Sequence, residues 1–367
     1  LTGSSNVGIG YETLYANTSG AYNVALGALA LDANTTADNN TAIGYATLTS
    51  NTTGIHNAAF GSAALFSNTT ANYNTAVGRE SLALNTTGAD NTATGYKALY
   101  TNTTGANNTA VGKGALTANT TANDNVSVGE QSMKANTTGA ENVALGQNAL
   151  QANTTASYNT ALGRNSLYTN TTGLQNVGVG RNTLYTNTTG AYNTALGNSA
   201  LYANTTASYN TSIGFEALAA NTTGAYNTAL GASSLSSETQ GSRSTALGFN
   251  ALLSQNFTSA TQAYNVAVGH NAGVENTTGT NNTFIGGLAG SANTTGETNT
   301  AIGSDALKAN TTGRRNTAVG YQALLVATTA EGNTAFGAYA GDSTTTGASN
   351  TFIGYDTAPA NTTGANN

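Results

Sequence analysis

The 367-residue chain contains no cysteine, one proline and few charged residues. Without cysteine, neither disulfide bonds nor thiol-ligated metals can support a fold. Charged residues make up 7% of the chain, against about a quarter in ordinary globular domains. Disordered chains usually carry a high net charge and lack regularly spaced aliphatic residues, so an ordered structure is the better prediction. No apolar stretch approaches the length that crosses a bilayer.

The sequence also has little that could carry out chemistry. Its formal net charge of −6 is spread thinly, and no basic run exceeds Arg314–Arg315, so nucleic-acid binding is not predicted. The two histidines, His56 and His270, belong to no Ser/His/Asp set, and no carboxylate pair recurs. Phosphate-loop and calcium-binding nonapeptide motifs are missing. We therefore predict no enzyme activity, no cofactor and no metal site.

What the sequence does have is a repeat of seventeen residues. The motif Asn-Thr-Ala-(Ile/Val/Leu)-Gly, with variations, ends at Gly10, Gly27, Gly44 and so on to Gly248, and after a four-residue insertion it ends at Gly269 and onward to Gly354. A short fixed period is typical of solenoids, in which each unit buries its apolar face against the next. Residues 1–367 are predicted to form a single repeat array with an irregular coil within 236–265. We expect the array to be part of a longer protein.

Numbering each repeat from this glycine as zero, the sequence predicts one coil of a parallel β-solenoid. Positions −3 to −1 indicate a strand, with Thr or Val at −3 and an aliphatic residue at −1 directed inward and Ala at −2 directed outward. A second strand over +3 to +6 is expected to bury Leu at +4 and to expose +5. Glycine at zero and the Asn-Thr-Thr-Gly segment supply the turns. About 21 coils spaced ~4.8 Å apart would make an all-β rod of roughly 100 Å.

Two asparagine columns, at −4 and +7, are expected to form ladders in which side-chain amides bond along the stack. Polar groups inside a coil need such partners, because burying them unpaired is costly. Representative members of the structural ladder at −4 are Asn40, Asn74, Asn91, Asn142, Asn159 and Asn193.

The small residue at −2 suggests a partner chain. If this column faces outward, its persistent Ala indicates a close neighbour, and lateral association of several rolls with cyclic symmetry is the economical explanation.

The Asn-Thr-Thr turns also create glycosylation sequons. The competing interpretation is that the Asn caps its turn and points inward. The candidate sites are Asn34, Asn51, Asn68, Asn85, Asn102, Asn119, Asn136, Asn153, Asn170, Asn187, Asn204 and Asn221.

The motifs Asn142–Gly146 (Asn-Val-Ala-Leu-Gly) and Asn40–Gly44 (Asn-Thr-Ala-Ile-Gly), each followed by x-x-Ala-Leu or a close variant, resemble the head repeats of trimeric autotransporter adhesins. That resemblance implies a left-handed parallel β-roll and a homotrimer wound about one axis. The family's usual unit is shorter, and this chain carries a longer Asn-Thr-Thr-Gly turn. The longer unit is similar to repeat arrays of phage tail fibres and bacterial surface fibres.

The predicted function is therefore a structural component of an extracellular or cell-surface fibre, with adhesin-like contacts distributed along a rod. Its expected partner is a further copy of itself, with host surfaces or glycans as other candidate ligands, and no nucleic acid. A phage tail-fibre shaft or receptor-binding fibre, on a virion, is one alternative. An ice-binding solenoid is another, although adjacent Thr residues at +8 and +9 should face opposite ways.

Overall fold

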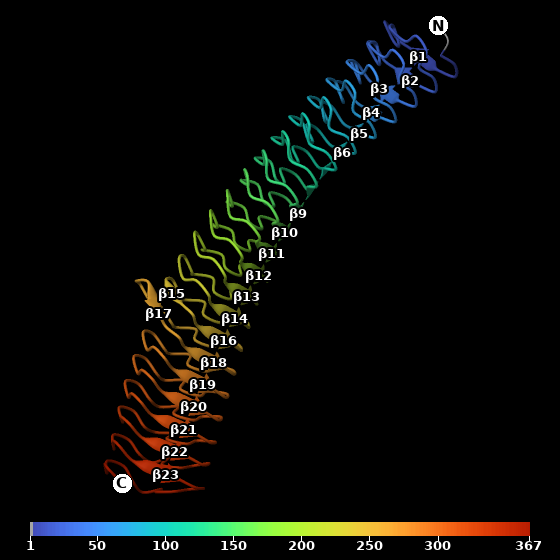
Figure 1. Cartoon of the computed structure of the whole chain (residues 1–367). Helices are drawn as coiled ribbons and strands as arrows, with labels where there is room; N and C mark the ends of the chain where they lie inside the picture. The colour runs from blue at the N-terminus through green and yellow to red at the C-terminus, as the bar shows by residue number, and fades with distance from the viewer. Residues whose placement is uncertain (1–2) are drawn as a thin grey trace. The chain divides into compact units, whose positions relative to one another are not determined.

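Each repeat contributes one short strand to the main sheet, and strands of successive repeats pair in parallel. In the computed structural model, which describes residues 3–367, these pairs build an all-β parallel solenoid with one coil per 17-residue repeat. The chain divides into two compact units, Leu1–Arg181 and Asn182–Asn367. Within each unit the strands of the main sheet follow one another in chain order, and in the second unit β15 and β17 lie beside this row (Figure 1).

The strands of the first unit are β1 (Val7–Ile9), β2 (Val24–Leu26), β3 (Thr41–Ile43), β4 (Ala58–Phe60), β5 (Thr75–Val77), β6 (Thr92–Thr94), β7 (Thr109–Val111), β8 (Val126–Val128), β9 (Val143–Leu145), β10 (Thr160–Leu162) and β11 (Val177–Val179). Those of the second unit are β12 (Thr194–Leu196), β13 (Thr211–Ile213), β14 (Thr228–Leu230), β15 (Gly241–Ser242), β16 (Thr245–Leu247), β17 (Thr261–Gln262), β18 (Val266–Val268), β19 (Thr283–Ile285), β20 (Thr300–Ile302), β21 (Thr317–Val319), β22 (Thr334–Phe336) and β23 (Thr351–Ile353). The four-residue insertion lies in this unit, where β15 and β17 form a separate parallel pair.

The register of the main sheet places equivalent repeat positions side by side. Thr160, Ala161 and Leu162 of β10 pair with Val143, Ala144 and Leu145 of β9. This register confirms that each coil is one repeat long and that side chains of one position form a continuous column.

The predicted orientation of the strand is wrong. The middle residue of the strand, at −2, is fully buried in coil after coil, as Ala144 and Ala195 are, whereas Leu145 and Leu196 at −1 are 37% and 45% exposed. Alternation along the strand was predicted correctly, but the face was not. The interior is narrow, so the small side chain fits inside and the large aliphatic one lies outside.

The predicted second strand over +3 to +6 does not form. This segment is a series of turns in which +2 and +4 have left-handed backbone, as at Gln131 (φ 56°) and Leu150 (φ 53°). Left-handed backbone costs an ordinary residue roughly 1–2 kcal/mol. Leu150 is nevertheless fully buried, and its N–H donates to the Ser166 carbonyl of the next coil at 2.9 Å. The inward position of Leu at +4 is therefore confirmed, in a conformation the periodicity did not indicate.

The glycine at zero allows successive coils to stack at this turn. Gly286 has φ of +134°, and a Cβ built on it would lie 2.5 Å from the carbonyl oxygen of Gly303 in the next coil. Only glycine combines this backbone angle with such a close approach of two chains. The repeat of the glycine thus follows from the coil geometry.

Candidate interaction surfaces

The asparagine columns hold the interior of the coil together. At −4, the backbone N–H of Asn91 donates to Asn74 Oδ1 at 3.0 Å, and Asn74 Nδ2 donates to the Gly88 carbonyl at 3.0 Å. The sequence-predicted members of this ladder are buried, with at most 1% of the residue exposed: Asn40, Asn74, Asn91, Asn142, Asn159 and Asn193. The prediction of structural asparagine ladders is confirmed.

The +7 column forms the second ladder, and it contains the predicted glycosylation sites. Asn68 Nδ2 donates to Asn51 Oδ1 at 2.9 Å and to the Ala71 carbonyl at 3.1 Å. All twelve candidates are fully buried, and every Nδ2 donates to the carbonyl three residues on: Asn34, Asn51, Asn68, Asn85, Asn102, Asn119, Asn136, Asn153, Asn170, Asn187, Asn204 and Asn221. A glycan on Nδ2 would displace this bond and require space that the coil interior lacks. The folded coil therefore does not support glycosylation at these positions.

The threonines that follow this asparagine have different environments. At +8, Thr137 Oγ1 donates to the Thr154 carbonyl of the next coil at 3.0 Å. At +9, the side chains of Thr138 and Thr155 are exposed. The two columns are thus oriented differently, as the sequence predicted.

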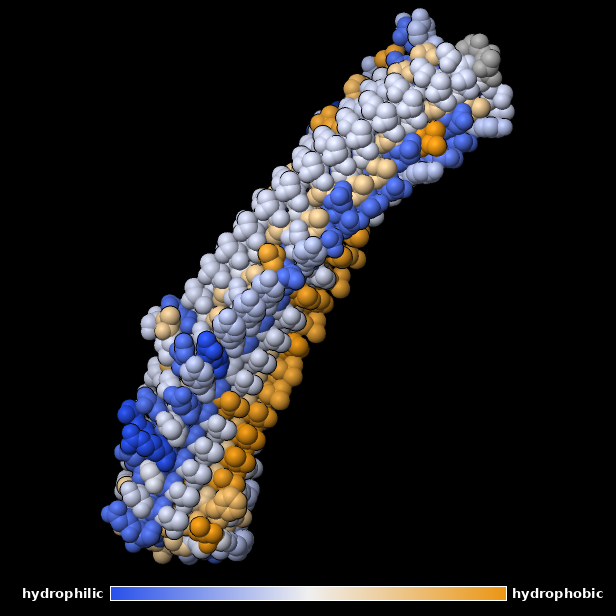
Figure 2. Space-filling view, viewed as in Figure 1, coloured by the Kyte–Doolittle hydropathy of each residue, from blue (hydrophilic) through white to orange (hydrophobic). Residues whose placement is uncertain are grey.

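The residues at −1 form an exposed apolar column on the outer side of the sheet. Every residue of this column except Thr94 is Ile, Val, Leu or Phe, and Leu162 and Leu196 are 44% and 45% exposed. The Thr, Val or Ala side chains at −3 lie on the same side of each strand. We call these two columns the strand face. Figure 2 shows hydrophobic side chains gathered in a band along the second unit.

Tyrosines form an exposed stack at −5, the position before the asparagine column. The ring centroids of Tyr192 and Tyr209 are 4.9 Å apart, and those of Tyr209 and Tyr226 are 5.1 Å apart, with both pairs nearly parallel. The Arg243 guanidinium continues the stack, 5.2 Å from the centroid of Tyr226 and 5.8 Å from that of Tyr264. Such contacts join neighbouring coils.

The irregular coil replaces ladder asparagines by a different buried network. Glu238 Oε1 accepts hydrogen bonds from three backbone N–H groups, including that of Gly241 at 2.6 Å. Gln255 Nε2 donates to Glu238 Oε2 at 2.8 Å and to Ser244 Oγ at 2.9 Å, and Gln255 Oε1 accepts from Asn265 Nδ2 at 2.8 Å. The sequence marked this segment as irregular but did not indicate that its carboxylate is buried.

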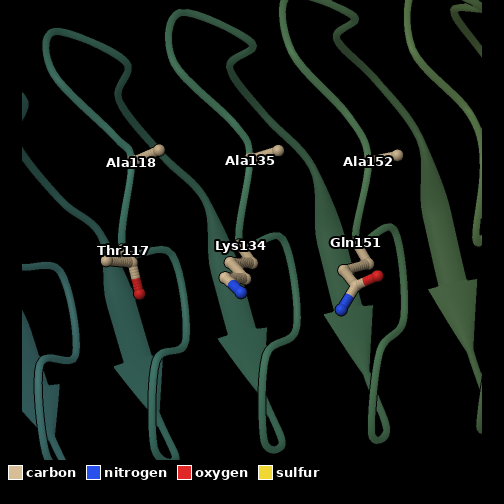
Figure 3. Close-up of a pocket in the computed structure, with 6 residues that line it drawn as sticks. All are labelled: Thr117, Ala118, Lys134, Ala135, Gln151 and Ala152. Carbon is tan, nitrogen blue, oxygen red and sulfur yellow. The ribbon is translucent and has the colours of Figure 1, made fainter.

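Two shallow recesses lie next to each other in the first unit. One, of about 520 Å³, is lined by the +5 and +6 residues of three successive coils, including Thr117, Lys134 and Gln151 (Figure 3). The second, of about 180 Å³, shares Thr117 and Lys134 with the first and adds Tyr96, Lys97, Lys113, Gly114 and Gln131. We call the two together the lysine recess.

In the described part of the chain, both histidines lie in aromatic stacks, and no cluster of metal-ligating side chains is found. His56 stacks on Tyr73 with centroids 5.2 Å apart, and His270 stacks on Phe249 at 5.5 Å. Residues 3–367 contain no group of three His, Asp or Glu side chains that could hold a metal ion. Over the same range, no helix has the length and hydropathy needed to cross a bilayer.

Comparison with known proteins assigns no family to the chain. No protein-family model matches it, and no curated protein is significantly similar to it. The fold and its surfaces are therefore the basis for any functional argument.

The sequence did not predict two of these surfaces, the strand face and the lysine recess. The strand face was missed because the alternation was assigned to the wrong side of the strand. The lysine recess was missed because its residues stand at different repeat positions. A usable signal existed, since three of the chain's four lysines, Lys97, Lys113 and Lys134, lie in three successive repeats.

Proposed function

We propose that the chain is a structural segment of an extracellular fibre or appendage, and that copies of it associate along the strand face. The observation that supports this proposal is the exposed apolar column at −1 within each unit. Burying such side chains is favourable by roughly 25 cal/mol per Å², and contiguous exposed apolar patches mark interaction surfaces.

The strand face suits a second copy of the same chain better than an unrelated partner. Its apolar side chains recur once per coil, at the ~4.8 Å spacing of paired strands. A partner that covers this face over many coils needs a surface with the same spacing, and another copy has one. Closed symmetric assemblies are the usual result of self-association, and the adhesin-like motifs favour three copies.

The alanine column at −2, from which the sequence predicted self-association, does not face a partner. The alanines at −2 lie inside the coil, as the fully buried Ala144 illustrates, so they do not require a partner chain. The large side chains at −1 now supply the reason, because they are exposed on an otherwise closed solenoid.

The test is the oligomeric state of the chain and of charged variants, measured by light scattering coupled to size exclusion. Leu145→Lys with Leu162→Lys places two charges on the strand face, and we expect it to dissociate the assembly. Thr138→Lys with Thr155→Lys places the same charges at exposed +9 positions and should leave the assembly intact. A wild-type monomer, or equal behaviour of the two variants, would contradict the proposal.

The extracellular part of the proposal has a separate test. Antibodies raised against the recombinant chain should label intact source cells, or isolated fibres, without permeabilisation. Labelling that requires permeabilisation would remove the extracellular assignment and leave self-association to be judged by light scattering.

One observation also favours ice binding as a second candidate function. In the second unit the outward residue at −3 is Thr in every strand of the strand face except β18. A regular threonine row beside an aliphatic row on a sheet could order water, which the +8 and +9 threonines could not do together. Thermal hysteresis that is lost in Thr211→Lys with Thr228→Lys would support this function, and absence of hysteresis would exclude it.

A further inference from the structure

Three lysines from successive coils converge on the lysine recess. Lys97 and Lys113 line the smaller recess, and Lys134 lines both recesses. Figure 3 shows Lys134 in a row with Thr117 and Gln151, whose side chains lie on the same side of three neighbouring coils. These positions are +1, +2 and +5, so the recess does not use the residues of the strand face.

The recess has an excess of positive charge in a chain that is negatively charged overall. Lys97 Nζ lies 3.3 Å from Glu80 Oε2, and Lys113 Nζ lies 3.4 Å from Glu130 Oε1. The hydrogen bond with Glu80, together with nearby Tyr96, raises the pKa of Lys97, so its amine stays charged. Among residues 3–367, no carboxylate lies within ion-pair distance of Lys134. Lys134 is thus the cation available to an anion.

Neutral polar and aromatic groups lie beside the lysines of the recess. Lys97 Nζ lies 5.5 Å from the ring centroid of Tyr96 and 5.1 Å from that of Tyr100, and Tyr96 is 42% exposed. Gln151 Nε2 donates to Gln131 Oε1 at 2.8 Å, which holds the two amides next to the recess. Tyrosine hydroxyls and amides both donate and accept hydrogen bonds, as recognition of a hydroxyl-rich ligand requires.

We propose that the lysine recess binds an acidic saccharide, a sugar chain that carries carboxylate or sulfate groups, with Lys134 contacting the anionic group. Lys97 and Lys113 provide further positive charge at the smaller recess, while Tyr96, Gln131 and Gln151 contact hydroxyls. Charge-assisted hydrogen bonds from lysine to the anion supply the strongest contacts. Because the two recesses adjoin across successive coils, the saccharide lies along the stack.

The same features argue against a nucleic acid. Lys97 and Lys113 are already paired with Glu80 and Glu130, so the recess lacks the run of unpaired cations that neutralises a phosphate backbone. An acidic peptide would use the same charges, so its binding is compared directly with that of the saccharides in the test below. The proposal does not depend on the fibre function, since the recess lies within one chain.

Binding to the full-length chain tests the proposal, with immobilised oligogalacturonate as the carboxylated probe and dextran sulfate as the sulfated probe. Unmodified dextran and polyglutamate serve as neutral-sugar and peptide controls. At least one acidic saccharide should bind, and which one does will distinguish carboxylate from sulfate recognition. Neutral dextran should not bind, and polyglutamate should bind at least tenfold more weakly.

Lys134→Gln should weaken saccharide binding about tenfold, the effect of losing one charge-assisted hydrogen bond. Lys308→Gln is the matched control, because Lys308 is the one lysine outside the recess and pairs with Asp305 at 2.9 Å. Both side chains are on the surface, and circular dichroism checks that both variants fold. The proposal is overturned if no acidic saccharide binds, if polyglutamate binds equally well, or if the two variants behave alike.

Discussion

Regular coils and the coil of Phe284 fill the same interior with different side chains. In a regular coil, Ala144 at −2 and Leu150 at +4 are both fully buried. In the second unit Phe284 occupies −2, and Gly273 and Gly290 occupy +4 in the preceding coil and in its own. A Cβ on Gly290 would lie 2.3 Å from Phe284 Cε1, so the ring takes up the leucine's space. The interior therefore constrains total volume and tolerates a change of residue type.

The amide columns show the same contrast. In regular coils each +7 asparagine donates to the one before it, as Asn68 does to Asn51. At Glu238 the carboxylate has no N–H to donate, and Asn221 Oδ1 is buried without a partner. The carboxylate is stabilised instead by backbone N–H groups and Gln255. The buried +7 position therefore needs hydrogen-bond partners, and polar groups other than asparagine can supply some of them.

The glycine at zero shows no such exchange, since it stands in every coil from Gly10 to Gly354. Its constraint comes from the backbone, which no side chain elsewhere can compensate. The side-chain columns tolerate replacement and the glycine column at zero does not, and this contrast leads to four predictions.

The largest effect is expected for Gly286→Ala. The new Cβ would lie 2.5 Å from the Gly303 carbonyl oxygen, and the residue would have to keep φ at +134°. We expect the clash and the backbone strain to lower the free energy of unfolding by about 5 kcal/mol. Gly287→Ala is the matched control, because no atom lies within 4 Å of its Cβ, and a change within about 0.5 kcal/mol is expected. Hydrogen exchange of the flanking coils measures both. Similar losses in the two variants would show that the glycine column is not a backbone requirement.

Phe284→Ala should lower the free energy of unfolding by about 4 kcal/mol, because it leaves a cavity beside two glycines. Adding Gly290→Leu should recover at least half of this loss, because Leu307 adopts left-handed backbone at the same position of the next coil (φ 53°). Chemical denaturation of the wild type and the three variants completes a double-mutant cycle. Additive effects in that cycle would refute the exchange of volume between these positions.

Asn136→Ala should lower the free energy of unfolding by about 3 kcal/mol. It removes the donor to Asn119 Oδ1 and the acceptor for Asn153 Nδ2, and both of these partner atoms belong to buried hydrogen bonds. Exchange protection should fall mainly in its own coil and the two adjacent ones, as expected for nearest-neighbour stability in a solenoid. Thr138→Ala changes an exposed position in the same turn and should leave protection unchanged. Global unfolding by Asn136→Ala alone would show that ladder defects are not local.

Ala327→Asn is expected to have the smallest effect, an increase of about 1 kcal/mol in the free energy of unfolding. Asn310 Oδ1 is buried without a partner one coil before Ala327, and regular coils show that the position accommodates an asparagine. The new amide would donate to this oxygen. A higher melting temperature is the expected outcome, and a lower one would mean that the solenoid has adapted to the missing amide at this site.

Much of the fold was predictable because it depends on periodicity. The repeat predicted parallel coils, the two asparagine ladders and the buried Leu at +4. It did not predict which side of the strand faces inward, because Thr-Ala-Leu alternates equally well in either direction. It also predicted a second strand where Leu150 and its equivalents have left-handed backbone, since burial of a leucine does not reveal its φ.

The candidate surfaces were less predictable. The sequence favoured self-association but attributed it to Ala144 and its equivalents, which are buried. The twelve candidate glycosylation sites that it offered have asparagines that turn inward, because a sequon specifies neighbours along the chain and not the direction of a side chain. The lysine recess combines residues from repeat positions that no single column contains.

The seventeen-residue period alone specifies the one-repeat coil, the positions of the turn glycines and the alignment of like residues along the stack, because these follow from a fixed period and from backbone sterics. Which columns lie inside depends on how the folded coil packs. The coil interior is too narrow for a large aliphatic residue at −1 as well as Leu at +4, so Ala at −2 and the asparagines fill it. The aliphatic column is left outside, where it is available to a partner.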